Sequence, residues 1–460
     1  MAGRSGAVSD APAARHLERA PPTALQRDAC PCRATRIRGR RASSRRSRAG
    51  RLVAMIVLTV LTAVCACVLL LPTVSDLISL VRATRRRSER PRSAPPARPA
   101  PPGTLPRLLV LVPAHNEELV LASCLGSLAL QRYPTERLTT VVVADNCSDR
   151  TAAIARGAGV RCLERHAPAE PGKPRAIAWA LHQLPFAEFD AVVIVDADTV
   201  VDRDFASALA TAAPLGGRVA QPYNDVSNRS ENALTRMAAV LSAANHRFAF
   251  GLKNRVGLNV PLSAGMCVGT EVLTAHGWNA FSICEDWEMY ALLTERGVRI
   301  ESIPGARIAA LEASSLRQGA SQRRRWQAGK LTVLARRWRS LVRSDHIGVV
   351  QKLDALAELS AVGPAVHLGM VALLAGLALL LRPPGAAALA AALAASLIRP
   401  TTYTISALRV DPEPVRALVA FAFLPAYTLW RFGIALSAWK MLGEARWVRT
   451  ERRPLSDRSP

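Results

Sequence analysis

Two aspartates, Asp196 and Asp198, follow an apolar run in the segment VIVDADTV. On an extended backbone, residues two positions apart point to the same side, so both carboxylates can hold one hard cation. A divalent ion held there, Mg2+ or Mn2+, would bridge the oxygens of a diphosphate. An ordinary acidic turn is the alternative, but the position of the pair at the end of a buried strand favours a metal and diphosphate site.

A second acidic pair, Glu285 and Asp286, lies in the segment CEDWEMYALLTERG. Both residues stand at the head of a predicted helix, where the helix dipole stabilises carboxylates that have no catalytic role. Adjacent acids at the mouth of a ligand cleft also suit general-base catalysis, because their mutual repulsion raises one pKa toward the working pH. The sequence therefore makes both residues catalytic candidates.

Asp145 and Lys173 are further polar candidates. Asp145 ends an apolar run and could accept hydrogen bonds from a base or ribose, as acidic residues at strand ends do in nucleotide-binding folds. Lys173, in PGKPRA, brings positive charge to a predicted helix start, which suits phosphates, although PGKP also forms a plausible turn by itself. We expect both residues to face a nucleotide.

An alternation of apolar strands and helices must position these residues. The predicted strands have continuous apolar character, which is typical of a parallel sheet covered by helices on both faces; they include LLVLV (108–112), TTVVVA (139–144) and AVVIV (191–195). Ligands of such α/β sheets bind beyond the carboxyl ends of the strands. The segments PAHNEE, DNCSD and DADTVVD follow these strands, so the acidic residues converge there.

Long apolar stretches on both sides of this region predict membrane helices. Residues 52–71 carry no charge over twenty positions, which is enough to cross about 30 Å of hydrocarbon as a helix. The predicted organisation is an Arg-rich disordered tail (1–51), a transmembrane anchor (52–82), a Pro/Arg linker (83–105), an α/β domain (106–345), two to three transmembrane helices (359–440) and a basic tail (441–460).

The charge of the chain is a poor guide to its partners. The formal net charge is +25, but the first 51 residues alone contain thirteen arginines against three acids, and no RNA-binding motif follows. We therefore expect membrane lipids as partners, and no nucleic acid. Arginines on both sides of the first apolar stretch conflict with the positive-inside rule, and a start at Met55, with residues 1–54 dispensable or untranslated, would resolve this.

The ordered set of Asp145, Asp196-x-Asp198, Glu285-Asp286 and Gln322-x-x-Arg325-Trp326 resembles the signature D, DxD, D, QxxRW of membrane-bound, inverting family 2 glycosyltransferases. That group contains synthases of cellulose, chitin and poly-N-acetylglucosamine, and the resemblance extends to ceramide glucosyltransferases. It covers roughly residues 105 to 345. It implies a GT-A-type, doubly wound, mostly parallel α/β sheet flanked by transmembrane helices.

The resemblance also implies roles for individual residues. The donor would be a nucleotide-diphosphate sugar, usually UDP-linked, and Asp286 would be the catalytic base. Donor-binding residues would be Glu117, Asp145, Lys173, Asp196, Asp198 and Arg325; Asp196 and Asp198 would also bind the metal, and Trp326 and Gln322 would contact the acceptor. Arg323 and Arg324 are expected to meet anionic headgroups from an amphipathic helix near 321–345.

The expected function is transfer of a sugar, with inversion, to a polysaccharide, glycan or lipid by a multi-pass protein of the cell membrane whose catalytic domain is cytosolic. The loop PLSAGMCVG lacks the Phe-Phe-Cys-Gly run of cellulose synthases, and the C-terminal apolar stretches are few and interrupted. Transfer of a single sugar therefore stands beside processive synthesis with partner subunits of an export complex. A non-catalytic, sugar-nucleotide-binding subunit of a synthase complex is the alternative.

Overall fold

A computed structural model describes residues 32–89, 105–383 and 385–438. The chain divides into two units, residues 1–58 and 59–460. In the first unit, the backbone described from Cys32 onward is helical and belongs to α1 (Cys32–Glu89). The predicted tail before Cys32, most of the linker (90–104) and the basic tail (441–460) lie outside the described residues. The sheet and the cavity described below belong to the second unit.

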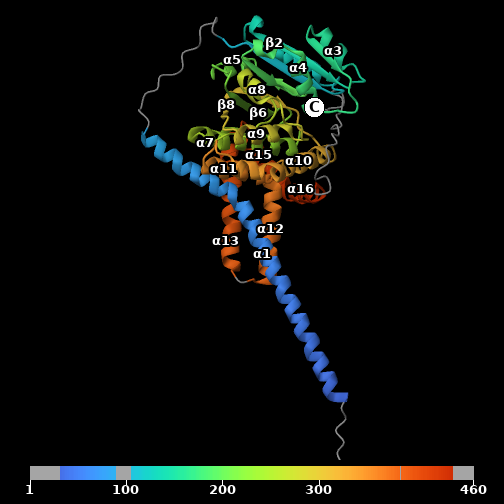
Figure 1. Ribbon diagram of the computed structural model, residues 1–460, viewed down its shortest axis with the longest axis vertical. Coiled ribbons are helices and arrows are strands. Elements are labelled where there is room, and N and C mark those ends of the chain that lie inside the picture. Colours follow the sequence, from blue (N-terminus) through green and yellow to red (C-terminus); the bar gives the residue numbers. More distant parts are fainter. Residues whose placement is uncertain (1–31, 90–104, 384, 439–460) are drawn as a thin grey trace, which may run out of the picture. The chain divides into compact units, whose positions relative to one another are not determined.

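The second unit contains an eight-stranded mixed sheet (Figure 1) in the order β3-β2-β1-β4-β7-β6-β8-β5. The strands are β1 (Leu108–Ala114), β2 (Leu138–Asp145), β3 (Arg161–Arg165), β4 (Ala191–Ile194), β5 (Thr199–Val201), β6 (Val219–Val226), β7 (Cys267–Gly269) and β8 (Ile300–Ala310). The first four run parallel to one another, as their apolar character predicts. Most strand pairs of the mixed sheet are parallel, as expected, because β6 also pairs parallel with β8; β7 is antiparallel to β4 and β6, and β5 is antiparallel to β8.

Alternate residues of β1 build two separate cores. Leu109 and Leu111 face a core that includes α4 (Lys173–Gln183), α8 (Thr270–His276) and α9 (Glu285–Glu295). Leu108 and Val110 face the opposite core, with α2 (Leu121–Ala129), α3 (Thr151–Gly157) and α5 (Phe205–Ala210). Since side chains alternate across a strand, continuous apolar strands are required to fill both cores, and the two-sided cover is confirmed.

The register of the parallel strands aligns their carboxyl ends. Leu108 of β1 lies opposite Leu138 of β2 and Ala191 of β4, so the three strands end at the same edge of the sheet. The predicted polar segments therefore meet there. Short 3-10 turns, η2 (Thr135–Arg137) and η3 (Phe186–Glu188), precede β2 and β4.

A helical segment after β6 lies beside strands β6 and β8. It consists of α6 (Ala233–Ala243), a π-helical turn η4 (Ala244–Ala249) and α7 (Phe250–Val256). Asn232 caps α6 through a reciprocal capping box with Thr235, which fixes where the helix starts. Further helices follow β8: α10 (Leu316–Arg343), α11 (Val349–Ser360), α12 (Pro364–Leu381), α13 (Ala386–Ser396), α14 (Ile398–Arg409), α15 (Pro414–Ala420), the turn η5 (Phe421–Phe423) and α16 (Leu424–Ala438).

Three helical segments among the described residues are long and apolar enough to cross a membrane: Met55–Arg85, Pro364–Leu381 and Pro414–Ala438. The apolar stretch beginning at Gly385, within the region predicted to hold two to three transmembrane helices (359–440), is divided between the short helices α13 and α14. Helices α12 and α13 lie side by side (Figure 1).

A buried ionic cluster joins four of the helices. Lys253 of α7 is fully buried and pairs with Asp354 and Glu358 of α11. Arg399 of α14 pairs with Glu358 and, at 2.8 Å, with Asp76 of α1. Because buried charges are costly unless they are paired, this network specifies how these helices dock.

Candidate active site

One large cavity, of about 1030 Å³, opens at the carboxyl ends of β1, β2 and β4. It extends past α9 and α10 to α6 and to the first residues of α12. All ten residues that the sequence singled out line it: Glu117, Asp145, Lys173, Asp196, Asp198, Glu285, Asp286, Gln322, Arg325 and Trp326. The fold therefore gathers into one space residues spread over more than 200 positions of the chain.

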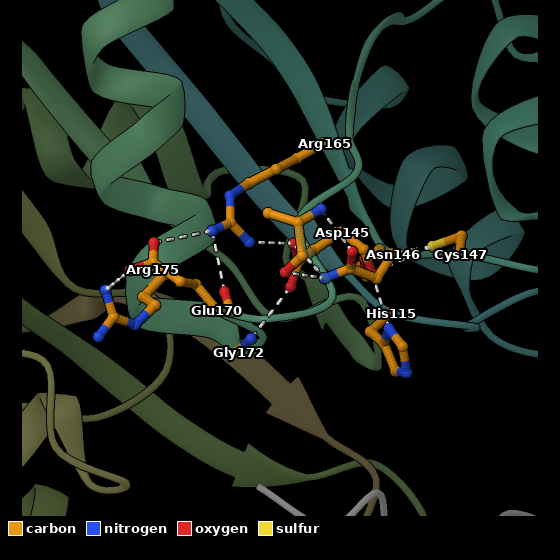
Figure 2. Close-up of polar contacts among 10 residues, drawn as sticks. His115, Asp145, Asn146, Cys147, Arg165, Glu170, Gly172 and Arg175 are labelled. Carbon is orange, nitrogen blue, oxygen red and sulfur yellow. Dashed lines mark hydrogen bonds and ion pairs between the residues drawn. The ribbon is translucent and has the colours of Figure 1, made fainter. Parts of the chain in front are cut away.

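At one end of the cavity, Asp145 is held by several internal hydrogen bonds (Figure 2). Its Oδ1 atom accepts from Arg165 at 2.6 Å and from Asn146 at 3.0 Å, and its Oδ2 atom accepts from the backbone N–H of Gly172 at 3.1 Å. Only 3% of Asp145 is exposed. This carboxylate ties the end of β2 to the loop that leads into α4.

His115 and Glu117 complete this end of the cavity. The ring nitrogen Nδ1 of His115 lies 2.6 Å from the carbonyl oxygen of Asp145 (Figure 2). The backbone N–H of Glu117 donates to the hydroxyl of Thr151 at 2.8 Å, and Glu117 itself is buried. The loops that follow β1 and β2 are thus bonded to each other and form a rigid wall.

Lys173 bridges the two acidic pairs. Its ammonium lies 2.5 Å from Asp196 Oδ1 and 2.7 Å from Glu285 Oε1. Burial works against the charged form, but the two carboxylates outweigh it and raise the pKa of Lys173 above its usual value. The lysine predicted to bind phosphate therefore also orders the carboxylates around it.

Asp286 has the most strongly perturbed carboxyl group at this site. Burial and the neighbouring Glu285 raise its pKa to about 7, while Lys173 and the N–H of Trp287 oppose the shift. The N–H of Trp287 donates to Asp286 Oδ1 at 2.8 Å. A carboxyl group that changes protonation near neutral pH, facing a ligand cavity, suits a general base.

Asp196 and Asp198 fit a divalent cation only in combination with a ligand. Both carboxylates line the cavity, and oxygen donors two positions apart are the ligands that hard cations prefer. Among the described residues, no cluster of three or more His, Cys, Asp or Glu side chains could hold a metal by itself. Magnesium is commonly bound by one or two carboxylates with substrate phosphates, and this donor set fits that arrangement.

Helix α10 carries the residues of the QxxRW motif. Arg325 and Gln322 line the cavity, and the Oε1 atom of Gln322 is buried without a hydrogen-bond partner. Trp326 is 41% exposed, and the Arg323 guanidinium lies 4.8 Å from the centre of its ring. The expectation that Arg323 meets headgroups is wrong, because its largely buried side chain pairs with Glu312 inside the fold.

Gly329 allows α10 to approach the catalytic acids closely. A Cβ atom at this position would lie 2.4 Å from the sulfur and 2.9 Å from the Cβ of Cys284, the residue before Glu285. The Cys284 sulfur in turn lies 3.8 and 3.7 Å from the carbonyl oxygens of Arg325 and Trp326. A single small residue thus fixes the position of α10 against the acidic pair.

Replacing Gly329 by alanine should therefore destabilise the protein by about 1–3 kcal/mol, the usual cost of overpacking a core. Thermal unfolding of the full chain in detergent measures this. Gly126, a helical glycine of α2 with open space around its Cα, is the matched control, and alanine there should be neutral or stabilise by up to about 1 kcal/mol. Equal behaviour of the two variants would contradict the close packing.

The far part of the cavity contains residues that the sequence did not single out. Ser263 and Ser282 have hydroxyl oxygens that are buried without partners, and His246 presents its ring from the π-helical turn. Lys330 donates to the carbonyl of Ala361 at 2.7 Å and lies 4.0 Å from the centre of the Trp287 ring. π-Helical turns often occur at functional sites, but no local sequence pattern reveals one.

Comparison with known proteins identifies the type of domain. Residues 106–329 match the family model described as "Glycosyltransferase like family 2". A beta-monoglucosyldiacylglycerol synthase from Synechocystis is 28% identical over 219 residues, covering 45% of each chain. An N-acetylglucosaminyltransferase from Rhizobium leguminosarum is 35% identical over 152 residues, covering 32% of this chain and 34% of the relative.

A solved structure, that of the mannosyltransferase PcManGT from Pyrobaculum calidifontis in complex with GDP-Man and Mn2+, shares the fold. It superposes with a TM-score of 0.50 at 19% identity, covering 84% of this chain and 97% of the other. The chain spans about half the length, or less, of the curated relatives it matches. The comparisons establish a GT-A-like fold with a family 2-like domain.

Proposed function

Residues 106–329 form a family 2-like glycosyltransferase domain, and from this we propose that the protein transfers one sugar from a nucleotide-diphosphate sugar to a lipid or glycan acceptor, with inversion. The observation that carries the proposal is the position of Asp286: its pKa is raised to about 7, and it faces the cavity that also holds Asp196, Asp198 and Arg325. The residues proposed as the base, as the diphosphate site and as the cation that stabilises the leaving group thus line one cavity.

In the proposed reaction, Asp286 takes the proton of an acceptor hydroxyl. The hydroxyl oxygen forms a bond to the anomeric carbon from the face opposite the nucleotide, and the bond from that carbon to the diphosphate breaks. Arg325 stabilises the negative charge on the departing nucleoside diphosphate. Because the leaving diphosphate needs no proton, a single carboxylate base is enough.

The DxD aspartates would hold the divalent ion that neutralises the diphosphate when it is bound. Asp145 and Glu117 shape the nucleoside end through the rigid wall that they form with Arg165 and Thr151. Glu285 is assigned a positioning role, because its carboxylate is paired with Lys173. Gln322, with its unpartnered buried oxygen, and Trp326 are assigned to the acceptor.

The three apolar helices support a multi-pass membrane protein, and a cytosolic catalytic domain is proposed with it. The relatives named for synthesis of a glucosyl-diacylglycerol lend weight to a lipid acceptor.

Release of free nucleotide from purified full-length protein tests the proposal. The assay contains Mn2+ or Mg2+, a panel of UDP- and GDP-sugars, and lipid or short-glycan acceptors. Release with one donor, dependent on an acceptor, supports the transferase and identifies both substrates. Saturable nucleotide binding without release under all these conditions would instead support the non-catalytic, sugar-nucleotide-binding subunit.

Replacing Lys173 by methionine should shift the pH dependence of turnover toward alkaline pH. Lys173 lowers the pKa of Asp286, so its removal raises that pKa and leaves less of the ionised base at pH 7. A rise of one pKa unit, from about 7 to about 8, lowers the ionised fraction of Asp286 at pH 7 from about one half to about one tenth, so we expect kcat at pH 7 to fall about fivefold. Lys173→Arg keeps the charge and should keep a midpoint close to that of the wild type; equal shifts in both variants would contradict the argument.

A further inference from the structure

Arg431 of α16 is a buried cation that the proposed reaction does not use. It is 9% exposed and lines the far part of the active-site cavity. Within the part of the chain that the structure describes, it makes no ion pair and no hydrogen bond. An ionisable side chain in an apolar helix is costly to bury, which makes it a candidate for a functional role.

The nearby charges leave this positive charge uncompensated. Arg323, on α10, lines the same part of the cavity, but it is paired with Glu312. Glu312 also accepts from the backbone N–H of Ala313 at 3.3 Å. Two arginines and one carboxylate leave a net charge of +1 beside the cavity, which an anionic ligand would neutralise.

The first turn of α12 adds to this attraction for an anion. A Cβ atom on Gly363, the residue that precedes α12, would lie 3.4 Å from the Nη2 atom of Arg431. Gly363 provides no side-chain cap for the helix, and Gly363, Pro364 and Ala365 all line the cavity. The N-terminus of an 18-residue helix carries a partial positive charge, so it and the guanidinium favour negative charge at the same place.

Apolar side chains surround this place. Leu234 and Met237 of α6 and Tyr427 of α16 line the cavity and belong to one apolar cluster that also includes Ala365. Helices α12 and α16 both lie in segments apolar enough to cross a membrane. A ligand that fits must therefore combine an anionic group with apolar chains.

We infer that Arg431 and the first turn of α12 bind the phosphate of a phospholipid acceptor, whose headgroup hydroxyl reaches Asp286 through the shared cavity. The assignment of this lipid as the acceptor rests on the proposed function. It selects an anionic lipid over a neutral diacylglycerol, because a neutral headgroup would leave the buried guanidinium without a partner.

Binding of defined lipids to the full chain in detergent tests the inference without turnover. In an Asp286→Asn background, dioleoyl phosphatidylglycerol and dioleoylglycerol are compared by native mass spectrometry and by ligand-induced thermal stabilisation. Arg431→Gln should weaken binding of phosphatidylglycerol about 10- to 100-fold, the usual effect of losing a hydrogen-bonded charge, and should leave binding of dioleoylglycerol unchanged. Arg431→Lys should retain part of the affinity.

The matched control is Arg416→Gln, in the same apolar segment, because the Arg416 side chain is 73% exposed. It should bind phosphatidylglycerol as the parent does. The inference is overturned if the parent and Arg431→Gln bind phosphatidylglycerol equally well. It is also overturned if soluble glycerol 1-phosphate binds as tightly as phosphatidylglycerol and depends on Arg431, because that would indicate a site for a free anion. If Arg431→Gln fails to fold, the Arg431→Lys variant is measured instead. Weaker binding of phosphatidylglycerol with unchanged binding of dioleoylglycerol supports the inference. Unchanged binding of phosphatidylglycerol, or the same loss of affinity for both lipids, overturns it.

Failure of the lipid site can be distinguished from failure of the proposed transferase activity. Selective, Arg431-dependent binding of phosphatidylglycerol without nucleotide release in the active-site assay would support the lipid site and contradict the transferase. Efficient transfer to dioleoylglycerol, undiminished in Arg431→Gln and unmatched by phosphatidylglycerol, would support the transferase and overturn the lipid site.

Discussion

Replacing Asp286 by asparagine is expected to lower kcat about 10²- to 10⁴-fold, the usual contribution of a general base. Asparagine has nearly the same shape but cannot accept the proton of the acceptor hydroxyl. Binding of the donor should change little, because the residues assigned to the donor remain. Nucleotide release and nucleotide binding, measured on the same preparation, separate the two effects.

The pH dependence of the wild type provides a second measure of the same group. Since the ionised form of Asp286 is the base and its pKa is raised to about 7, kcat should rise with pH through about 7 and then level off. The residual activity of Asp286→Asn should lack this rise. Asp345→Asn, at an exposed position, is the control and should retain both the rate and the profile. A variant at position 286 with activity within tenfold of the wild type would refute the role.

Replacing Arg165 by glutamine is expected to destabilise the protein by about 3–5 kcal/mol, because it leaves the buried carboxylate of Asp145 without its ionic partner. The two side chains are 6% and 4% exposed, so solvent screens this pair little. Arg165 also donates to the carbonyl of Glu170 at 2.9 Å, in the loop that leads to Lys173. Thermal unfolding of the full chain measures the loss.

The neighbouring pair Arg156 and Glu164 is the control, because these side chains are 57% and 56% exposed. Arg156→Gln should change the free energy of unfolding by no more than about 1 kcal/mol. If Arg165→Gln behaved in the same way, Asp145 would not depend on its ion pair, and the rigid wall at this end of the cavity would need another explanation.

The parallel half of the fold and its acidic edge could be predicted because their signals are local. Strands such as β1 and β2 are continuous apolar runs, and the residues that follow them fall by register at one edge of the sheet. The two acidic pairs and the QxxRW segment were therefore found as separate motifs, and the fold brings them together.

The half of the sheet formed by β5 to β8 and the far part of the cavity lack such signals. Strand β7 has only three residues. Strands β6 and β8 contain Pro222 and Pro304, and a proline inside an apolar run argues against a strand. The pairing of Arg323 with Glu312, eleven positions away, turns an expected surface arginine inward. The guanidinium of Arg431 lies close to Gly363, 68 positions away in the chain, and only this proximity makes it a candidate for a binding site. Such long-range pairings leave no periodic pattern in the sequence.

The construction of the two ends of the cavity from different elements has a consequence for how such a protein can diversify. The proposed nucleotide end is built by β1, β2 and β4 with their loops, whereas the far end is lined by residues of α6, α12 and α16. Substitutions that reshape one end leave the supports of the other in place. Under the proposed assignment of the two ends, a lineage can therefore exchange one acceptor for another by changing these helices, while it keeps the same donor and the same chemistry.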